Sequence, residues 1–147
     1  MLKETIERLQ YLCDTIPQLM NVISEKDFSH KPAPNKWSKK EMLGHLIDSA
    51  TNNHQRFVRI QFENEPVIGY DQNSWNLINQ YNRLDMHHLI KFWEIYNRHL
   101  LEIMKRVPEH NLGLTGIDLN ENKATLGFLM DDYVIHMEHH LRQMVSY

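Results

Sequence analysis

The sequence predicts an all-α protein, a four-helix bundle with an up-down-down-up course and a long crossover between its second and third helices. It contains five glycines and five prolines among 147 residues, too few for the frequent turns of a β-sandwich or barrel. Four segments repeat apolar residues every three or four positions, which is the period of an amphipathic helix. A long connection separates the second segment from the third, as in bundles whose neighbouring helices run parallel.

The first helical segment covers roughly residues 6–23. Its apolar stripe consists of Ile6, Leu9, Cys13, Ile16, Met20 and Ile23. Pro17 lies inside this stripe, and we expect it to kink or interrupt the helix because its ring removes a backbone donor. Pro32 and Pro34 then predict an extended connector over residues 31–35.

The second segment begins with a clear local signal. Ser38 is followed by Glu41 three residues later, the spacing of a capping box in which each side chain bonds the other residue's amide. Apolar residues continue to about residue 63. The connection over residues 64–81 contains Pro66 and Gly69, and loops of this length are often functional.

The remaining chain supplies two more helices. The third runs from about Met86 to Val107 and stops at Pro108. Residues 112–123 are rich in turn formers, and we expect a small hairpin there. The fourth helix runs from about Thr125 to the end. No repeat or change of composition divides the chain, so we predict a single domain over residues 1–147.

Composition and charge exclude several classes of protein. The formal net charge is −3, which argues against partners such as nucleic acid or a membrane surface. Cys13 is the only cysteine, so no internal disulfide forms and a reducing compartment is indicated. The first eight residues mix charges without an apolar leader segment. We therefore expect a cytoplasmic protein whose partner is a small molecule.

Histidine is unusually frequent, with ten residues. His136 and His140 are four positions apart, so on a helix they share one face, beside the apolar stripe. Chance produces such pairs in many histidine-rich chains, so the spacing alone is weak evidence. His45 lies among leucines in the second helix, on a polar strip that continues through Ser49, Asn52 and Arg56.

Three histidines from two helices, with a fourth position open, match the ligand number of a catalytic zinc-type site. Nitrogen ligands alone do not select among zinc, nickel, iron and manganese, and we favour zinc or nickel. Spacing leaves an alternative open, in which His45, His136 and His140 are hydrogen-bonded core residues that hold no metal.

The chain resembles the DinB/YfiT family of metal-dependent enzymes, in particular its YfiT-like branch. The resemblance extends over the second helix, the crossover and the fourth helix. The matching residues are Trp37-Ser38, Gly44-His45-Leu46-Ile47-Asp48-Ser49, Asn52, Arg56-Phe57, Tyr70-Asp71, Trp75 and His136-Met137-Glu138-His139-His140-Leu141.

This resemblance implies the same up-down-down-up bundle and a divalent metal held by His45, His136 and His140. It also implies one of two activities. Members of the family are described as hydrolases, or as transferases that join a low-molecular-weight thiol such as bacillithiol or mycothiol to an electrophile. Some members carry a further histidine where this chain has Ala50, so any role of that histidine is absent or moved here.

Three further residues are candidates for the substrate pocket. Arg56 has the fork geometry to bind a substrate carboxylate, and Asp48 is placed to orient an imidazole; Asn52 lies between them on the polar strip. A salt bridge to a neighbouring helix is the structural alternative for Arg56 and Asp48. The crossover residues, which line the pocket or anchor their own loop, are Tyr70, Asp71 and Trp75.

Competing interpretations stay open at this stage. A non-catalytic helical bundle, serving as a binding or stress-response module, would keep the histidines without an activity. A haem protein is disfavoured because no attachment sequence occurs, and a cysteine nucleophile because Cys13 falls on an apolar stripe. A homodimer is compatible with the sequence but is not indicated by any repeat pattern.

Overall fold

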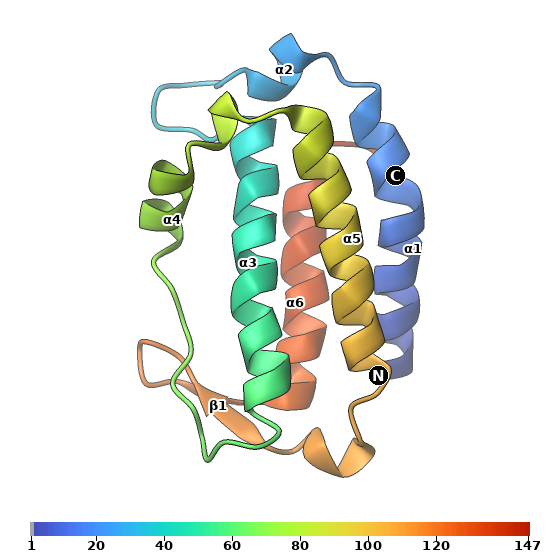
Figure 1. Ribbon diagram of the computed structural model, residues 1–147, viewed down its shortest axis with the longest axis vertical. Helices are drawn as coiled ribbons and strands as arrows, with labels where there is room; N and C mark the ends of the chain where they lie inside the picture. Colours follow the sequence, from blue (N-terminus) through green and yellow to red (C-terminus); the bar gives the residue numbers. More distant parts are fainter. Residues whose placement is uncertain (1) are drawn as a thin grey trace.

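Four long helices form the body of the protein in a computed structural model, which describes residues 2–147. They are α1 (Leu2–Asn21), α3 (Lys39–Arg59), α5 (Met86–Met104) and α6 (Leu126–Leu141). Both α5 and α6 pack against α3 and against α1. In Figure 1, α3 and α5 descend from the top of the bundle whereas α1 and α6 ascend. The helical class expected from the sequence is confirmed.

Short elements lie at the two ends of the bundle and, in the case of α4 (Gln72–Asn79), along the side of α3 (Figure 1). They are α2 (Glu25–Ser29), α4, the 3-10 helices η1 (Tyr81–Arg83) and η2 (Glu109–Asn111), and strands β1 (Thr115–Ile117) and β2 (Lys123–Thr125). The strands pair antiparallel, with Gly116 opposite Ala124, and the predicted small hairpin is therefore present. Val67 of the crossover forms a parallel bridge with Ile117, so the crossover lies against this hairpin.

Helix α1 continues through Pro17, and the prediction of an interruption there is wrong. Proline lacks the amide that would bond the carbonyl four residues earlier, which belongs to Cys13. That oxygen instead accepts a hydrogen bond from Nη2 of Arg98 on α5, at 3.1 Å. A side chain from another helix thus replaces the missing backbone donor, which the local sequence of α1 does not reveal.

The start of α3 follows the prediction closely, because Ser38 and Glu41 form both halves of the capping box. Its end at Arg59 comes earlier than the predicted residue 63. The crossover was predicted as a loop but contains α4, whose first turn is capped by the Asp71 carboxylate. Gln80 adopts a left-handed conformation and ends this short helix.

The apolar core lies between the four long helices. One buried face of α3 is polar instead of apolar. Polar side chains on α3 are almost fully buried there, with exposed fractions of 1% for His45, 3% for Asp48, 5% for Ser49 and 9% for Asn52. Buried polar groups need partners, so this strip marks the place to look for a site. None of the helices over residues 2–147 combines the length and the apolar composition that a membrane crossing requires.

Candidate metal centre

Three imidazoles meet where α3 packs against α6. His45 comes from α3, and His136 and His140 come from consecutive turns of α6. The Nε2 atom of His136 lies 3.3 Å from Nε2 of His45 and 3.2 Å from Nε2 of His140. Donor atoms of all three rings lie within 4.8 Å of one another. The structure thus brings together the three residues that the sequence singled out.

The spacing of these nitrogens suits a tetrahedral metal ion. Bonds of about 2.0–2.1 Å from zinc to nitrogen place two ligands of a tetrahedron about 3.3–3.4 Å apart. The two Nε2 separations of 3.2 and 3.3 Å come close to this value. A cation would satisfy three lone pairs at once, whereas each neutral imidazole has only one proton to share. The donor set therefore fits a divalent transition metal.

Burial keeps the three rings in the form that binds metals. Desolvation, followed by the mutual repulsion of the rings, lowers the pKa of His45 to about 3 and that of His140 to about 4. Burial likewise lowers the pKa of His136. All three imidazoles are therefore neutral near pH 7, and neutral imidazole is the ligand form.

Aromatic groups surround His45. The ring of Trp37, immediately before the cap of α3, lies 4.9 Å from the His45 ring, centroid to centroid. The hydroxyl of Tyr70 lies 3.5 Å from the Nδ1 atom of His45. On the other side of the triad, Nδ1 of His140 is buried without a hydrogen-bond partner in the described structure. Tyr70 is thus the side chain placed to fix the ring of His45.

A cleft of about 410 Å³ opens beside His45 and His136. On its α3 side, the polar strip predicted from the sequence continues from His45 through Ser49 and Asn52 to Arg56. These positions are four, three and four residues apart and share one helix face. Arg56 and Asn52 therefore lie on the wall of the same cleft as the histidines.

Asp48 has a different environment from the one proposed for it. Its Oδ1 atom accepts hydrogen bonds from the hydroxyl of Tyr81 and from the amide of Asn79. Both partners belong to the end of the crossover, and among residues 2–147 the Asp48 carboxylate has no hydrogen bond to an imidazole. Gly44 makes this packing possible, since a Cβ atom there would lie 2.1 to 2.5 Å from the Tyr81 ring. Asp48 connects the crossover to α3.

The three crossover residues singled out from the sequence have different roles: one lines the cleft, and two stabilise the loop. Tyr70 lines the cleft. The Asp71 carboxylate accepts hydrogen bonds from the backbone amides of Asn73 and Ser74 and so caps α4. The ring of Trp75 packs at 5.5 Å against Tyr70. One member therefore contributes to the site, and the other two hold the loop that carries it.

Part of the cleft wall was not identified from the sequence. The turn of the β1–β2 hairpin contributes Asp118, Leu119 and Asn120, and α6 contributes Asp132. The segment 112–123 is recognisable as a hairpin by its turn residues. Its contact with the crossover through Val67 and Ile117 depends on tertiary packing, for which no local pattern exists.

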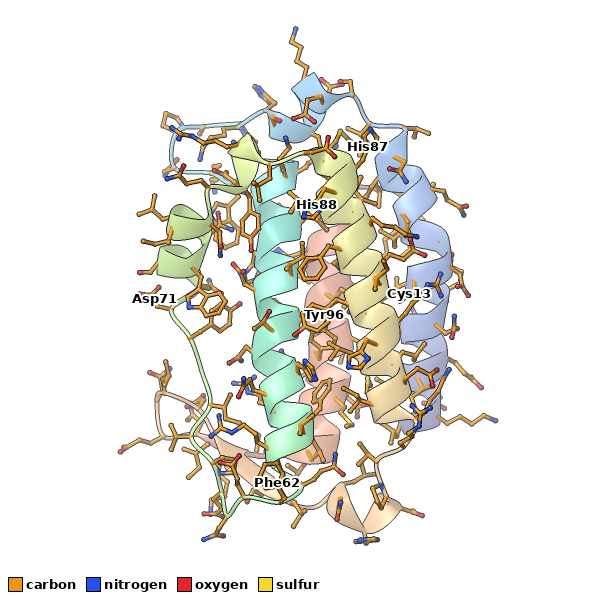
Figure 2. All side chains as sticks on the ribbon, viewed as in Figure 1. Cys13, Phe62, Asp71, His87, His88 and Tyr96 are labelled. Carbon is orange, nitrogen blue, oxygen red and sulfur yellow. The ribbon has the colours of Figure 1, made fainter. Side chains whose placement is uncertain are left out.

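Other nucleophilic or ligating groups lie elsewhere. Cys13 on α1, labelled in Figure 2, is buried, and burial raises the pKa of its thiol to about 12. Such a thiol is not a nucleophile at neutral pH. Glu138 forms an ion pair with Arg8. Within residues 2–147, the three histidines are the one group of ligand side chains close enough to hold a metal.

Comparisons with known proteins identify the family of this chain and structures that share its fold. A family model of the DinB superfamily matches residues 1–144. A protein of Oceanobacillus iheyensis, named a candidate metal-dependent hydrolase, is 20% identical over 139 residues, which are 94% of this chain and 80% of that protein.

Two solved structures share the fold. YfiT from Bacillus subtilis, described as a candidate metal-dependent hydrolase with an unusual four-helix bundle topology, matches with a TM-score of 0.88 and 18% identity. The match covers 97% of this chain and 83% of YfiT. A variant of the mycothiol-dependent maleylpyruvate isomerase matches with a TM-score of 0.80 and 9% identity, over 99% of this chain and 62% of the isomerase.

Proposed function

Since this chain belongs to the DinB superfamily, we propose that it is a metal-dependent enzyme in which His45, His136 and His140 hold one divalent transition metal. The convergence of the three imidazoles carries the proposal: Nε2 of His136 lies 3.3 Å from that of His45 and 3.2 Å from that of His140, and donor atoms of all three lie within 4.8 Å of one another. An all-nitrogen donor set favours zinc or nickel over hard cations. The up-down-down-up course is part of the same proposal, because it places α3 beside α6.

The metal would supply Lewis acidity and lower the pKa of a water or thiol that it binds. The residues of the chain provide the surroundings. His45 is buried beneath Trp37 and Tyr70, so water is partly excluded from one side of the centre. The open cleft beside His136 leaves the other side accessible to a small molecule.

Two reactions suit this centre, namely transfer of a low-molecular-weight thiol to an electrophile, and hydrolysis. The position of the histidines between two clefts supports the transfer. His45 and His136 line the cleft of about 410 Å³, whereas His140 lines a separate one of about 580 Å³ with Trp37 and Met42. A reaction between two small molecules needs two binding places that meet, and hydrolysis needs one.

The function is tested with defined probes. Metal-stripped and zinc- or nickel-reloaded protein is assayed with bacillithiol or mycothiol and monochlorobimane. In the conjugation the thiol sulfur bonds to the bimane carbon, chloride leaves and the thiol proton passes to solvent. Hydrolysis is assayed in parallel with p-nitrophenyl acetate.

We expect metal-dependent conjugation that is lost in His136→Ala and kept in His139→Ala, the exposed neighbour on α6. Ester hydrolysis without conjugation would assign the hydrolase instead. If neither rate depends on metal or on His136, the proposal is wrong and the protein is a non-catalytic bundle.

A further inference from the structure

We propose that Arg56 and Asn52 form an oxyanion-binding subsite at the end of the cleft remote from the histidines. The substrate is then a small molecule with a carboxylate or phosphate at the end opposite its reacting atom. This inference rests on the proposed function, because it assigns a substrate class to the same cleft.

Arg56 is a charged side chain without an ionic partner. It is half-buried on α3, and among residues 2–147 no carboxylate oxygen lies within the 4.0 Å of an ion pair. Its guanidinium donates to the carbonyl of Ile68 at 3.3 Å and to Oδ1 of Asn53 at 3.5 Å. A guanidinium has five N–H donors in a planar fork. Most of its donor capacity is therefore unused, and the group lies on the cleft wall.

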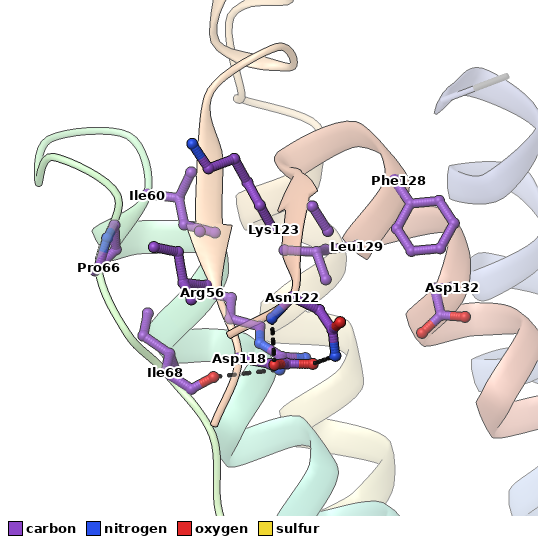
Figure 3. A pocket seen from close by; sticks show the side chains of 13 residues that line it. Arg56, Ile60, Pro66, Ile68, Asp118, Asn122, Lys123, Phe128, Leu129 and Asp132 are labelled. Atoms are coloured by element: carbon purple, nitrogen blue, oxygen red, sulfur yellow. Dashed lines mark hydrogen bonds between the residues drawn. The ribbon is translucent and has the colours of Figure 1, made fainter. Parts of the chain in front are cut away.

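Two carboxylates near Arg56 do not neutralise it at contact distance. Asp118 accepts hydrogen bonds from the amides of Asn120 and Asn122 at 2.8 and 2.9 Å, and it attracts Arg56 only at a distance longer than an ion pair. Asp132 is exposed on α6. Figure 3 shows Arg56 beside Ile68 and Asp118, in a cavity of about 260 Å³ that adjoins the cleft. The arginine is thus accessible from two sides.

Asn52 gives the second, independent observation. Its side chain is only 9% exposed and lines the cleft, yet its amide has no hydrogen-bond partner within the described part of the chain. The Asn52 amide is not one of the fully buried polar atoms that lack a partner among the described residues, so it reaches the cleft, where it is free to donate to a ligand. Because Asn52 precedes Arg56 by one helical turn, both donors present the same face to a ligand.

The length of the strip limits the substrate. Eleven residues separate His45 from Arg56, a rise of about 16 Å along α3. The arginine side chain leans back toward the helix N-terminus and shortens this gap. A cleft of about 410 Å³ lies within the range of small-molecule sites. An elongated molecule fits this arrangement, with its oxyanion on Arg56 and its reacting atom beside the histidines.

The alternative is that Arg56 only ties the crossover to α3 through Ile68. Arg56→Gln keeps a donor for that carbonyl but removes the charge and the fork. Asn52→Asp keeps the shape of the amide and adds a repelling charge. Arg59→Gln is the matched control, because Arg59 is on the same helix, changes the net charge equally and is paired with Glu63 instead.

The test is a titration of the metal-free protein with inorganic phosphate and with benzoate, followed by amide chemical shifts. We expect saturable shifts around residues 52–56 with at least one of the two probes, and the preferred probe identifies the oxyanion. The dissociation constant should rise about tenfold or more in Arg56→Gln and in Asn52→Asp, and stay within about twofold in Arg59→Gln.

Equal affinity in wild type and Arg56→Gln, or shifts spread over other surfaces, would overturn the subsite. The metal-free titration does not depend on the metal centre, so failure here is separable from failure of the proposed function. Metal content of Arg56→Gln is measured as well, and we expect it to equal that of wild type.

Discussion

Helix α3 carries two histidines in opposite kinds of environment, and the difference between them distinguishes a candidate ligand site from a structural contact. His54, nine residues after His45, is half-buried and hydrogen-bonds through Nδ1 to the hydroxyl of Tyr96 at 3.0 Å. Its ring also meets the edge of His99, at 5.4 Å between centroids. His45 is 1% exposed and faces nitrogen atoms of other imidazoles.

The comparison shows that the partners of a histidine are more informative than its burial. The Tyr96 hydroxyl pairs with Nδ1 of His54, so this imidazole has an ordinary hydrogen-bond partner. At the triad, nitrogen faces nitrogen, and the rings are most simply satisfied by a cation. Under the function proposed above, the same helix supplies one metal ligand, His45, and one packing residue, His54.

The largest expected effect is stabilisation by metal, which should depend on the histidine triad and not on His54. A ligand that binds only the folded state at a thousandfold excess over its dissociation constant raises the free energy of unfolding by about 4 kcal/mol. We expect zinc or nickel to produce this in wild type and in His54→Ala, and not in His136→Ala. Denaturant unfolding with and without metal measures it. If metal no longer stabilised His54→Ala, the distinction between a ligand histidine and a packing histidine on α3 would be wrong.

The next effect concerns Asp48, which this comparison groups with His54 because its partners are Tyr81 and Asn79. Burial raises the pKa of Asp48 to about 6, above an unfolded value of about 3.9. The folded state therefore keeps a proton that the unfolded state has lost, and stability falls as the pH rises from about 4 to 6.

Asp48→Asn lacks this titration. As the pH rises from 4 to 7, we expect its free energy of unfolding to increase by about 2–3 kcal/mol relative to that of wild type. Unfolding curves of both proteins at each pH measure the gain, and the titration of the histidines cancels in the difference. Metal content should be unchanged in the variant. A pH-independent difference would show that folding does not raise the pKa of Asp48, and loss of metal would assign Asp48 to the metal centre.

The smallest expected effect is the contribution of the hydrogen bond between His54 and Tyr96 to stability. Tyr96→Phe removes the hydroxyl that bonds His54 and should cost about 0.5–1.5 kcal/mol, the net value of one hydrogen bond. The combined Tyr96→Phe and His54→Ala variant closes a double-mutant cycle. Additive losses would show that this contact is not energetically coupled, and the structural role assigned to His54 would fail.

Periodic patterns made much of this architecture predictable. The four long helices and the capping box at Ser38 follow from local sequence, and so does the small hairpin. The spacing of His136 and His140 and the polar strip beginning at His45 identified these side chains as candidates, and the family resemblance predicted that they form one site.

What could not be predicted depends on contacts between distant segments. Pro17 is accommodated because Arg98 bonds the freed carbonyl of Cys13, and neither helix alone indicates this. Asp48 turned out to bond the crossover because Gly44 admits the ring of Tyr81. The hairpin turn at Asp118 reaches the cleft only through its packing on the crossover.

Metal content measured by plasma mass spectrometry, on protein without an affinity tag, tests the central claim most directly. Wild type and His54→Ala should each contain close to one zinc or nickel per chain, and His45→Ala and His140→Ala almost none, with all four folded. Metal retained in both His45→Ala and His140→Ala, or absent from wild type even after reloading, would contradict a three-histidine metal centre.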